Sequence, residues 1–249
     1  MSTIAYTISA HEYNDHLFDV ELTFNCQANQ NYTLSLPAWL PGSYMIRDFA
    51  KNIIQLSAHS QNKAPLTIHK LDKQTWQITA TDGQISVNYQ VFAFDLSVRT
   101  AYLDNQRGFF NGSSTFLAVQ ELQHHSCQLI IKPIADKPHW QVATGLRRTS
   151  YTRKYHFGEY LATDYQELID CPVAIGELDL IEFTVEGVPH HLVFTSRHYG
   201  DRNRMAADIS KLCQHHINLF GEAPFNEYWF ITHLLEEGFG GLEHKNSTI

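Results

Sequence analysis

The residues best suited to chemistry lie at the C-terminal end of the sequence, where Gly240 and Gly241 are followed by Glu243. They come after an apolar run, YWFITHLL, that is typical of a strand. Glycines in extended backbone let another chain approach closely, so a peptide could pair with this segment as an added strand. The carboxylate of Glu243 could then hold an ammonium group. The same pattern also fits an exposed strand end with a surface glutamate, and the residues alone leave both interpretations open.

The 15 histidines make a metal site the next hypothesis. Three adjacent pairs occur, but neighbouring side chains diverge on a strand or a helix, so neither geometry brings both rings onto one ion. HEYND at His11 begins like the zinc motif HExxH, but its fifth residue is Asp15 instead of the required histidine. The chain also lacks a Gly-x-Ser-x-Gly motif and the Lys-Ser/Thr of a phosphate loop. We therefore assign no metal ligand and no catalytic residue to this chain.

Composition and charge are those of a globular protein. Hydrophobic residues make up 43% and charged residues 18% of the chain, and the net charge is -8. An acidic chain of this kind argues against nucleic-acid partners and anionic membranes, which attract basic patches. The N-terminal sequence lacks the basic and apolar regions of a signal peptide, and the four cysteines form no CxxC pair. We therefore expect a cytoplasmic protein with reduced thiols.

Alternating apolar and polar residues predict strands over the first two thirds of the chain. In HLFDVELTF, the side chains of Phe18, Val20, Leu22 and Phe24 share one face, which is the period of a half-buried strand. Similar short stretches, rich in β-branched and aromatic residues, continue to about residue 176. Short alternating strands separated by turns predict a mainly β protein that begins with an antiparallel β-sandwich.

Helical spacing appears later, in RNRMAADISKLCQHHINLFG, where apolar residues recur at steps of three and four. Gly221 suits the position just past the end of this helix, and either Asp201 or Asn203 could cap its start. An apolar strand follows. We therefore predict a β-sandwich domain over residues 1–176 and the α+β start of a second, incomplete domain over residues 177–249.

Two longer stretches interrupt the predicted strands. LPAWLPGSYMIRDFAKNI, from Leu36 to Ile53, contains a tight Pro41-Gly42 turn between two large aromatic residues. It fits either a buried sandwich corner or a corner that packs against the second domain. VRTAYLDNQRGFFNGSSTFL is long for a hairpin; long loops are often functional, but this one also fits a plain loop.

Four of these stretches together resemble the M61 metallopeptidases, the glycyl aminopeptidase family: LPAWLPGSYMIRDFA, RGFFNGSS, DCPVAIGE and GGLEHKNST. They occur in the order of the family, and the resemblance covers the whole chain. More distantly, the layout is similar to that of M1 aminopeptidases, in which a β-sandwich precedes a thermolysin-like domain. The resemblance implies that residues 177–249 begin a thermolysin-like catalytic domain.

The resemblance also implies a zinc-dependent aminopeptidase that removes N-terminal residues from peptides. In such enzymes, zinc held by HExxH and a downstream glutamate activates a water molecule. The Gly-Gly-x-Glu segment lies along the peptide substrate, and its glutamate binds the free amino terminus. By that match Glu243 would be the anchor, and Gly240 and Gly241 would offer backbone groups.

The sequence departs from the family in one respect, because it contains no HExxH. In the family that motif follows shortly after GGLEH, so we expect an N-terminal fragment that binds no zinc itself. The zinc site and a PDZ domain would belong to a later part. Such a fragment should self-associate through an unpaired strand edge, from about Glu227 to Leu242. Two alternatives stay open: a stand-alone, non-catalytic β-sandwich binding module, and an independent enzyme with an unrecognised His or Asp/Glu site.

Overall fold

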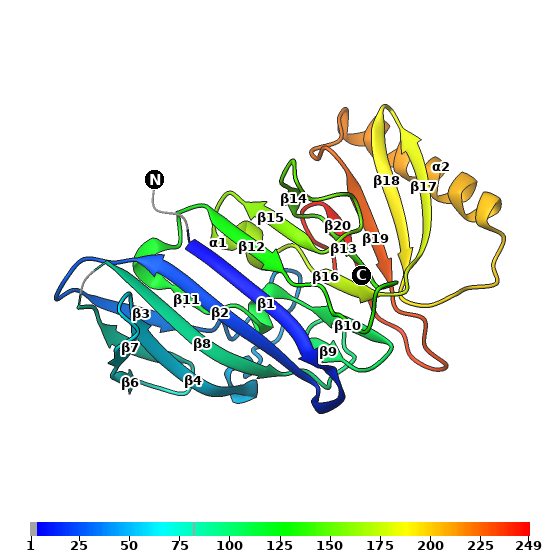
Figure 1. Ribbon diagram of the computed structural model, residues 1–249. Helices are drawn as coiled ribbons and strands as arrows, with labels where there is room; N and C mark the ends of the chain where they lie inside the picture. Colours follow the sequence, from blue (N-terminus) through cyan, green and yellow to red (C-terminus); the bar gives the residue numbers. More distant parts are fainter. Residues whose placement is uncertain (1–3, 82) are drawn as a thin grey trace.

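The computed structural model describes residues 4–81 and 83–249. Within these residues the chain forms four β-sheets and two α-helices, so the prediction of a mainly β protein is confirmed (Figure 1). The first three residues of the predicted sandwich domain, and Asp82, lie outside the described residues. No helix of the described residues is long and apolar enough to cross a membrane.

The largest sheet has eight strands and forms one layer of the sandwich, from blue to green in Figure 1. Across the sheet, its strands are β14 (Arg147–Arg148), β15 (Gly158–Ala162), β12 (Cys127–Ile131), β1 (Ile4–Glu12), β2 (Leu17–Asn25), β8 (Gln84–Phe92), β4 (Ile53–Ser60) and β5 (Pro65–Leu66). The pair β1–β12 is parallel, and the other neighbouring strands are antiparallel. The first strand of the chain therefore sits in the middle of the sheet.

Two sheets of four antiparallel strands complete this part of the molecule. One contains β13 (Gln141–Thr144), β16 (Val173–Gly176), β10 (Arg107–Phe110) and β9 (Ala101–Leu103), and the other contains β11 (Ala118–Val119), β3 (Asn31–Ser35), β7 (Thr75–Thr79) and β6 (Ile68–Lys70). Short 3₁₀ turns cover Tyr13–Asp15, Phe49–Asn52, Gly112–Ser114 and Gln120–Leu122. The short helix α1 (Tyr165–Ile169) starts at Asp164, whose side chain accepts a hydrogen bond from the backbone N–H of Glu167.

The core between these sheets follows the predicted alternation. In β2 the side chains of Phe18, Val20, Leu22 and Phe24 are buried, while the residues between them are partly exposed, so this prediction is confirmed. Each such side chain stabilises the fold by about 1.5–3 kcal/mol through burial of apolar surface. The residues of this face belong to one continuous cluster that contains side chains of all three sheets.

The stretch from Val98 to Leu117 is an ordered part of the core. It contains β9, β10 and a 3₁₀ turn, and the Asn111 side chain inside it is fully buried. The Nδ2 of Asn111 donates to the carbonyl of Val98 at 2.9 Å, which ties the interior of the stretch to its first residue. The buried hydroxyls of Tyr6 and Tyr89 donate to the carbonyls of Leu117 and Thr115 at 2.8 and 2.9 Å. The interpretation of this stretch as a plain loop is therefore wrong.

The fourth sheet contains β17 (Asp179–Val185), β18 (Val188–Phe194), β19 (Tyr228–Thr232) and β20 (Ser247–Thr248). Helix α2 (Arg202–Phe220) connects β18 to β19, and these strands are parallel, as a strand–helix–strand unit requires. The helix begins at Asp201, whose side chain accepts from the N–H of Arg204, and ends at Gly221 with φ of +86°. The structure thus confirms the predicted helix and identifies Asp201, instead of Asn203, as its cap.

The two faces of the fourth sheet have different neighbours. One face packs on the sandwich, in a cluster made of Phe109, Ala143, Ala174, Val193, Trp229 and Ile231. Helix α2 covers the opposite face and lies farthest from the sandwich (Figure 1). Its apolar stripe is only partly covered, since Leu219 and Phe220 are 66% and 75% exposed. Beside it, an apolar groove of about 420 Å³ contains Ile217, Phe220, Phe225 and Phe230.

The prediction that YWFITHLL forms an unpaired strand edge is wrong. Strand β19 pairs with β18 on one side and with β20 on the other, where Trp229 lies opposite Ser247. Trp229 and Ile231 are almost completely buried. The outer strand of this sheet is β20, which is two residues long and therefore shows no sequence period. Self-association of the chain is a separate matter and stays a prediction.

Candidate functional site

The Gly-rich end of the sequence forms a short hairpin, here called the C-terminal hairpin (residues 240–249). The N–H groups of Leu242 and Ile249 each donate to the other residue's carbonyl at 3.0 Å, and His244 N–H donates to the carbonyl of Ser247 at 2.9 Å. Glu243 lies opposite Thr248 in an antiparallel bridge. One edge of the Leu242–Glu243 backbone is therefore occupied by the chain itself.

Gly240 and Gly241 precede this pairing and are exposed. A Cβ atom on Gly240 would meet no atom within 4 Å among the described residues, so the backbone there is open to a partner. The side chain of Glu243 is also exposed, and within the described residues no hydrogen bond or ion pair engages its carboxylate. The three residues singled out from the sequence are thus close together and accessible.

His244 fixes the C-terminal hairpin to the sandwich. Its side chain is buried, and its Nδ1 lies 3.0 Å from Oδ1 of Asp170. The other oxygen of Asp170 accepts the N–H of Lys245 at 3.1 Å. Asp170 thereby binds the two residues that follow Glu243. No role for Asp170 or His244 was predicted from the sequence, although both lie in stretches on which the family resemblance rests.

Asn246 makes a second attachment to the sandwich. Its Nδ2 donates to the carbonyl of Gly145 at 2.8 Å. A Cβ atom on Gly145 would lie 2.3 Å from Oδ1 of Asn246, so a glycine is needed for this close approach. The thiol of Cys171 also lies against this amide, with Sγ 3.7 Å from the same oxygen.

The Pro41-Gly42 turn contacts the hairpin near Glu243. Gly42 has φ of +78°, and a Cβ atom there would lie 2.8 Å from Cδ1 of Leu242 and 2.9 Å from the carbonyl oxygen of Glu243. The side chain of Leu242 is 1% exposed and belongs to the core of the sandwich. Of the two interpretations of this corner, the structure supports packing against the C-terminal part.

Further residues lie near the contact between the Pro41-Gly42 turn and the C-terminal hairpin. Arg99 donates from Nη2 to the carbonyl of Gly241 at 3.5 Å. The loop after Gly42 exposes three consecutive apolar side chains, Tyr44 to Ile46, and Phe239 immediately before Gly240 is also fully exposed. Consecutive exposed apolar side chains, as at residues 44–46, are typical of contact sites for other molecules.

A polar cluster, here called the His191 cluster, links the sandwich to the fourth sheet elsewhere. His191 is buried, with Nδ1 3.1 Å from the hydroxyl of Tyr155 and Nε2 3.3 Å from Oε2 of Glu227. Lys154 pairs with Glu182 at 2.6 Å. Burial raises the pKa of Glu227, but the hydrogen bond and charge of His191 outweigh it, so this pKa lies below its usual value. The cluster holds the two parts together by charge-assisted contacts.

The structure also tests the metal hypothesis on the described residues. None of their His, Cys, Asp and Glu side chains forms a group of three or more that could hold a metal ion. The adjacent His190 and His191 diverge as expected: His190 stacks on Phe183 at 5.3 Å, and His191 packs on Trp229 at 4.1 Å. The described residues therefore do not fit a zinc site.

A sandwich followed by a mixed sheet is a fold shared with zinc metallopeptidases. The M1 zinc metallopeptidase from Deinococcus radiodurans matches with a TM-score of 0.55 and 11% identity, over 100% of this chain and 58% of that chain. A mutant of that enzyme bound to a Tyr-Ser-Ala substrate matches with a TM-score of 0.56 and 10% identity, over 100% of this chain and 59% of that chain. At this identity the likeness concerns the fold alone.

The chain belongs to the M61 peptidase family, because the family model of the Peptidase M61 N-terminal domain matches residues 5–177. An aminopeptidase N family protein from Idiomarina loihiensis is 46% identical, with a TM-score of 0.95. The match covers 99% of this chain and 41% of that chain, so the chain spans less than half the length of this relative. A comparison with curated proteins found no match.

Proposed function

We propose that this chain is the N-terminal part of a zinc-dependent aminopeptidase and that the C-terminal hairpin holds the amino terminus of a peptide substrate. The observation that carries the proposal is the exposed, unpaired carboxylate of Glu243 on a hairpin anchored from two sides. The turn at Gly42 contacts it on one side, and Asp170 holds His244 on the other. A carboxylate held in this way is suited to a primary ammonium, because a charge-assisted hydrogen bond needs a fixed acceptor.

Each residue of the hairpin has a distinct task in this proposal. Gly240 and Gly241 offer backbone N–H and C=O groups to an extended peptide, which pairs with them as an added strand. Glu243 binds the ammonium group and so sets which peptide bond is presented. Bound zinc would supply Lewis-acid activation of water, and its ligands would belong to the part of the fold that the match to the Idiomarina protein leaves uncovered.

Further properties of the whole protein are part of the same proposal. Residues 1–176 act as a sandwich domain and residues 177–249 as the start of a thermolysin-like catalytic domain, with a PDZ domain farther along. The peptidase acts in the cytoplasm, and the acidic net charge of -8 supports the absence of nucleic-acid and membrane partners.

The test compares the 249-residue chain with the whole protein that contains it. The whole protein should release the N-terminal residue from aminoacyl substrates and lose this activity on chelation, with recovery on adding zinc. The 249-residue chain should remain inactive with zinc. Chelator-resistant activity of the 249-residue chain would favour an independent enzyme. A whole protein that binds peptides with no hydrolysis would favour the binding module.

A further inference from the structure

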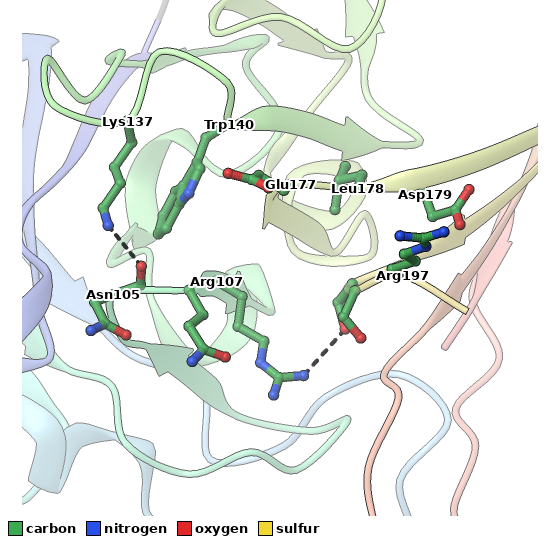
Figure 2. A pocket seen from close by; sticks show the side chains of 11 residues that line it. Asn105, Arg107, Lys137, Trp140, Glu177, Leu178, Asp179 and Arg197 are labelled. Carbon is green, nitrogen blue, oxygen red and sulfur yellow. Dashed lines mark hydrogen bonds between the residues drawn. The ribbon is translucent and has the colours of Figure 1, made fainter. Parts of the chain in front are cut away.

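A second cavity lies between the sandwich and the fourth sheet, and no residue of the C-terminal hairpin lines it. Its volume is about 590 Å³, which is within the range of small-molecule sites. Arg107, at the start of β10, and Lys137 and Trp140 line it from the sandwich. Thr195 and Arg197, just after β18, line it from the fourth sheet (Figure 2). A ligand there would contact both parts of the molecule.

Three cations line this cavity without a carboxylate partner among the described residues: Arg107, Lys137 and Arg197. Lys137 donates to the carbonyl of Asn105 at 2.8 Å, and its Nζ lies 4.8 Å from the ring centroid of Tyr13 and 5.5 Å from that of Trp140. Arg197 stacks over Tyr199 at 5.3 Å. Two carboxylates also line the cavity, Glu177 and Asp179. Asp179 is already used, because it pairs with Arg202 and lies 3.6 Å from His198, so Glu177 alone offsets the three cations. In a chain with a net charge of -8, such a surplus of unpaired cations at one cavity favours anions.

Arg107 has the strongest need of an anion. Its Nη1 makes only long contacts, at 3.4 Å, to the hydroxyl of Thr195 and to the carbonyl of Leu234. Its Nε is buried and has no hydrogen-bond partner within the described residues. A partly buried guanidinium without a counter-charge is costly, and its planar fork matches carboxylate or phosphate oxygens.

The neighbouring residues show that this charge acts on its surroundings. Burial, with a further contribution from the charge of Arg107, lowers the pKa of His233 to about 4. The His233 ring packs edge-on against Phe109 at 4.6 Å. On the other side of the cavity lies Trp140, which is 6% exposed and so offers a ligand only a small apolar contact.

We propose that this cavity binds a small organic anion that carries two or more carboxylate or phosphate groups. Arg107 receives one group through its guanidinium fork, and Lys137 and Arg197 neutralise the others. The carbon skeleton of the anion touches the small exposed part of Trp140. Because the lining residues come from the sandwich and from the fourth sheet, a bound anion stabilises the contact between them.

The test is calorimetric titration of the whole protein and of the 249-residue chain with citrate, fructose 1,6-bisphosphate and acetate at constant ionic strength. Citrate or fructose 1,6-bisphosphate should bind once per chain and raise the unfolding temperature, and the stronger of the two identifies carboxylate or phosphate as the preferred group. Acetate should bind at least tenfold more weakly. If none of these anions binds at millimolar concentration above a sodium chloride control, the proposal is wrong.

Variants separate this site from general charge effects. R107Q should weaken binding at least tenfold, and K137Q, which alters a side chain nearer the surface, should weaken it several-fold. The matched control is R204Q, because Arg204 is 80% exposed on α2 and pairs with Asp208. Binding that is equal in K137Q and R204Q would overturn the proposal even if R107Q failed to fold.

An NMR titration of His233 tests the position of the ligand and does not depend on the measured affinity of the anion. Neutralising Arg107 removes a charge that disfavours the protonated ring, so the bound anion should raise the pKa of His233 in an NMR titration. An unchanged His233 titration at saturating anion would contradict the proposed position of the ligand.

Discussion

The Cα of Gly42 and the backbone of Glu243 approach so closely that a Cβ atom on Gly42 would lie 2.9 Å from the Glu243 carbonyl oxygen. The position of Glu243 is therefore set by a turn near the start of the chain. This contact joins the two stretches most specific to the family resemblance, LPAWLPGSYMIRDFA and GGLEHKNST. It gives a physical reason why the sandwich accompanies the proposed peptide site.

Gly42→Ala should destabilise the chain and displace the hairpin. A side chain at φ of +78° costs about 1–2 kcal/mol, and crowding against a backbone oxygen adds roughly 1–3 kcal/mol. Urea unfolding measures the loss, and hydrogen exchange at residues 240–249 measures the displacement. Gly240→Ala is the control, because that position has open space around it. Equal stability of the two variants would argue against the contact.

Glu243→Ala in the whole protein should lower kcat/KM by about ten- to a hundredfold for peptides with a free amino terminus. The reason is the loss of a charge-assisted hydrogen bond that contributes roughly 1.5–3 kcal/mol. Kinetics with one peptide, free and N-acetylated, measure the effect, and only the free form should be affected. Glu237→Ala, at an exposed glutamate of the preceding loop, serves as the control. A loss of zinc, or an equal effect on both peptides, would refute the anchor role.

His233 should make stability depend on pH between about 6.5 and 4. Its pKa is about 4 in the folded chain against an ordinary 6.5, so the unfolded chain takes up this proton first as the pH falls. The contribution of His233 to the free energy of unfolding should therefore stay constant above pH 6.5 and drop by roughly 2–3 kcal/mol toward pH 4. Unfolding curves measured at several pH values should show that His233→Gln loses most of this pH dependence. His215→Gln, at an exposed histidine of α2, should keep it.

Asp170→Ala should release the C-terminal hairpin, because it leaves His244 and the N–H of Lys245 without their acceptor. The readout is the alkylation rate of Cys171, whose thiol lies against Asn246 of the hairpin and whose pKa burial raises. This rate should rise at least tenfold. Cys127 is the internal control: its pKa is raised to about 12 by burial in the sandwich, and its reactivity should not change. Equal acceleration of both thiols would indicate global unfolding instead of release.

The 249-residue chain should self-associate, and the exposed apolar stripe of α2 gives this prediction a location. Phe220→Lys places a charge at a position that is 75% exposed and borders the apolar groove. Sedimentation at several concentrations should show dimers or larger species of the original chain and weaker association of the variant. The control is Lys211→Glu on the same helix, which changes charge outside the groove. A monomer at all concentrations would contradict the prediction.

Local features of this fold were predictable from the sequence. Helix α2 could be located because its apolar spacing and its cap at Gly221 depend on residues within one or two turns. The buried face of β2 could be read from a period of two. Asp201 and Asn203 both have side chains that suit an N-cap, so the sequence left two candidates. Backbone geometry decides between them and selects Asp201.

Long-range contacts were not predictable in this way. Asp170 and His244 are far apart in the sequence, and nothing in the local sequence around either residue indicates that they pair. The same holds for the parallel pair of β1 and β12. The expectation of an unpaired edge failed because β20 is too short to display a pattern. The cations around the second cavity come from separate stretches, so only the folded chain brings them together.

The central place of β1 in the eight-stranded sheet bears on how the protein is made. During synthesis β1 can pair with β2 at once, but its other edge has no neighbour until residues 127–131 have left the ribosome. Its apolar face, with Ile4, Tyr6 and Ile8, stays incompletely covered for the whole of that interval. Pairings so distant in sequence form slowly and leave nascent strands open to association. We therefore expect a ribosome-bound chain that stops before residue 127 to require a chaperone, and one that includes β12 to depend on it far less.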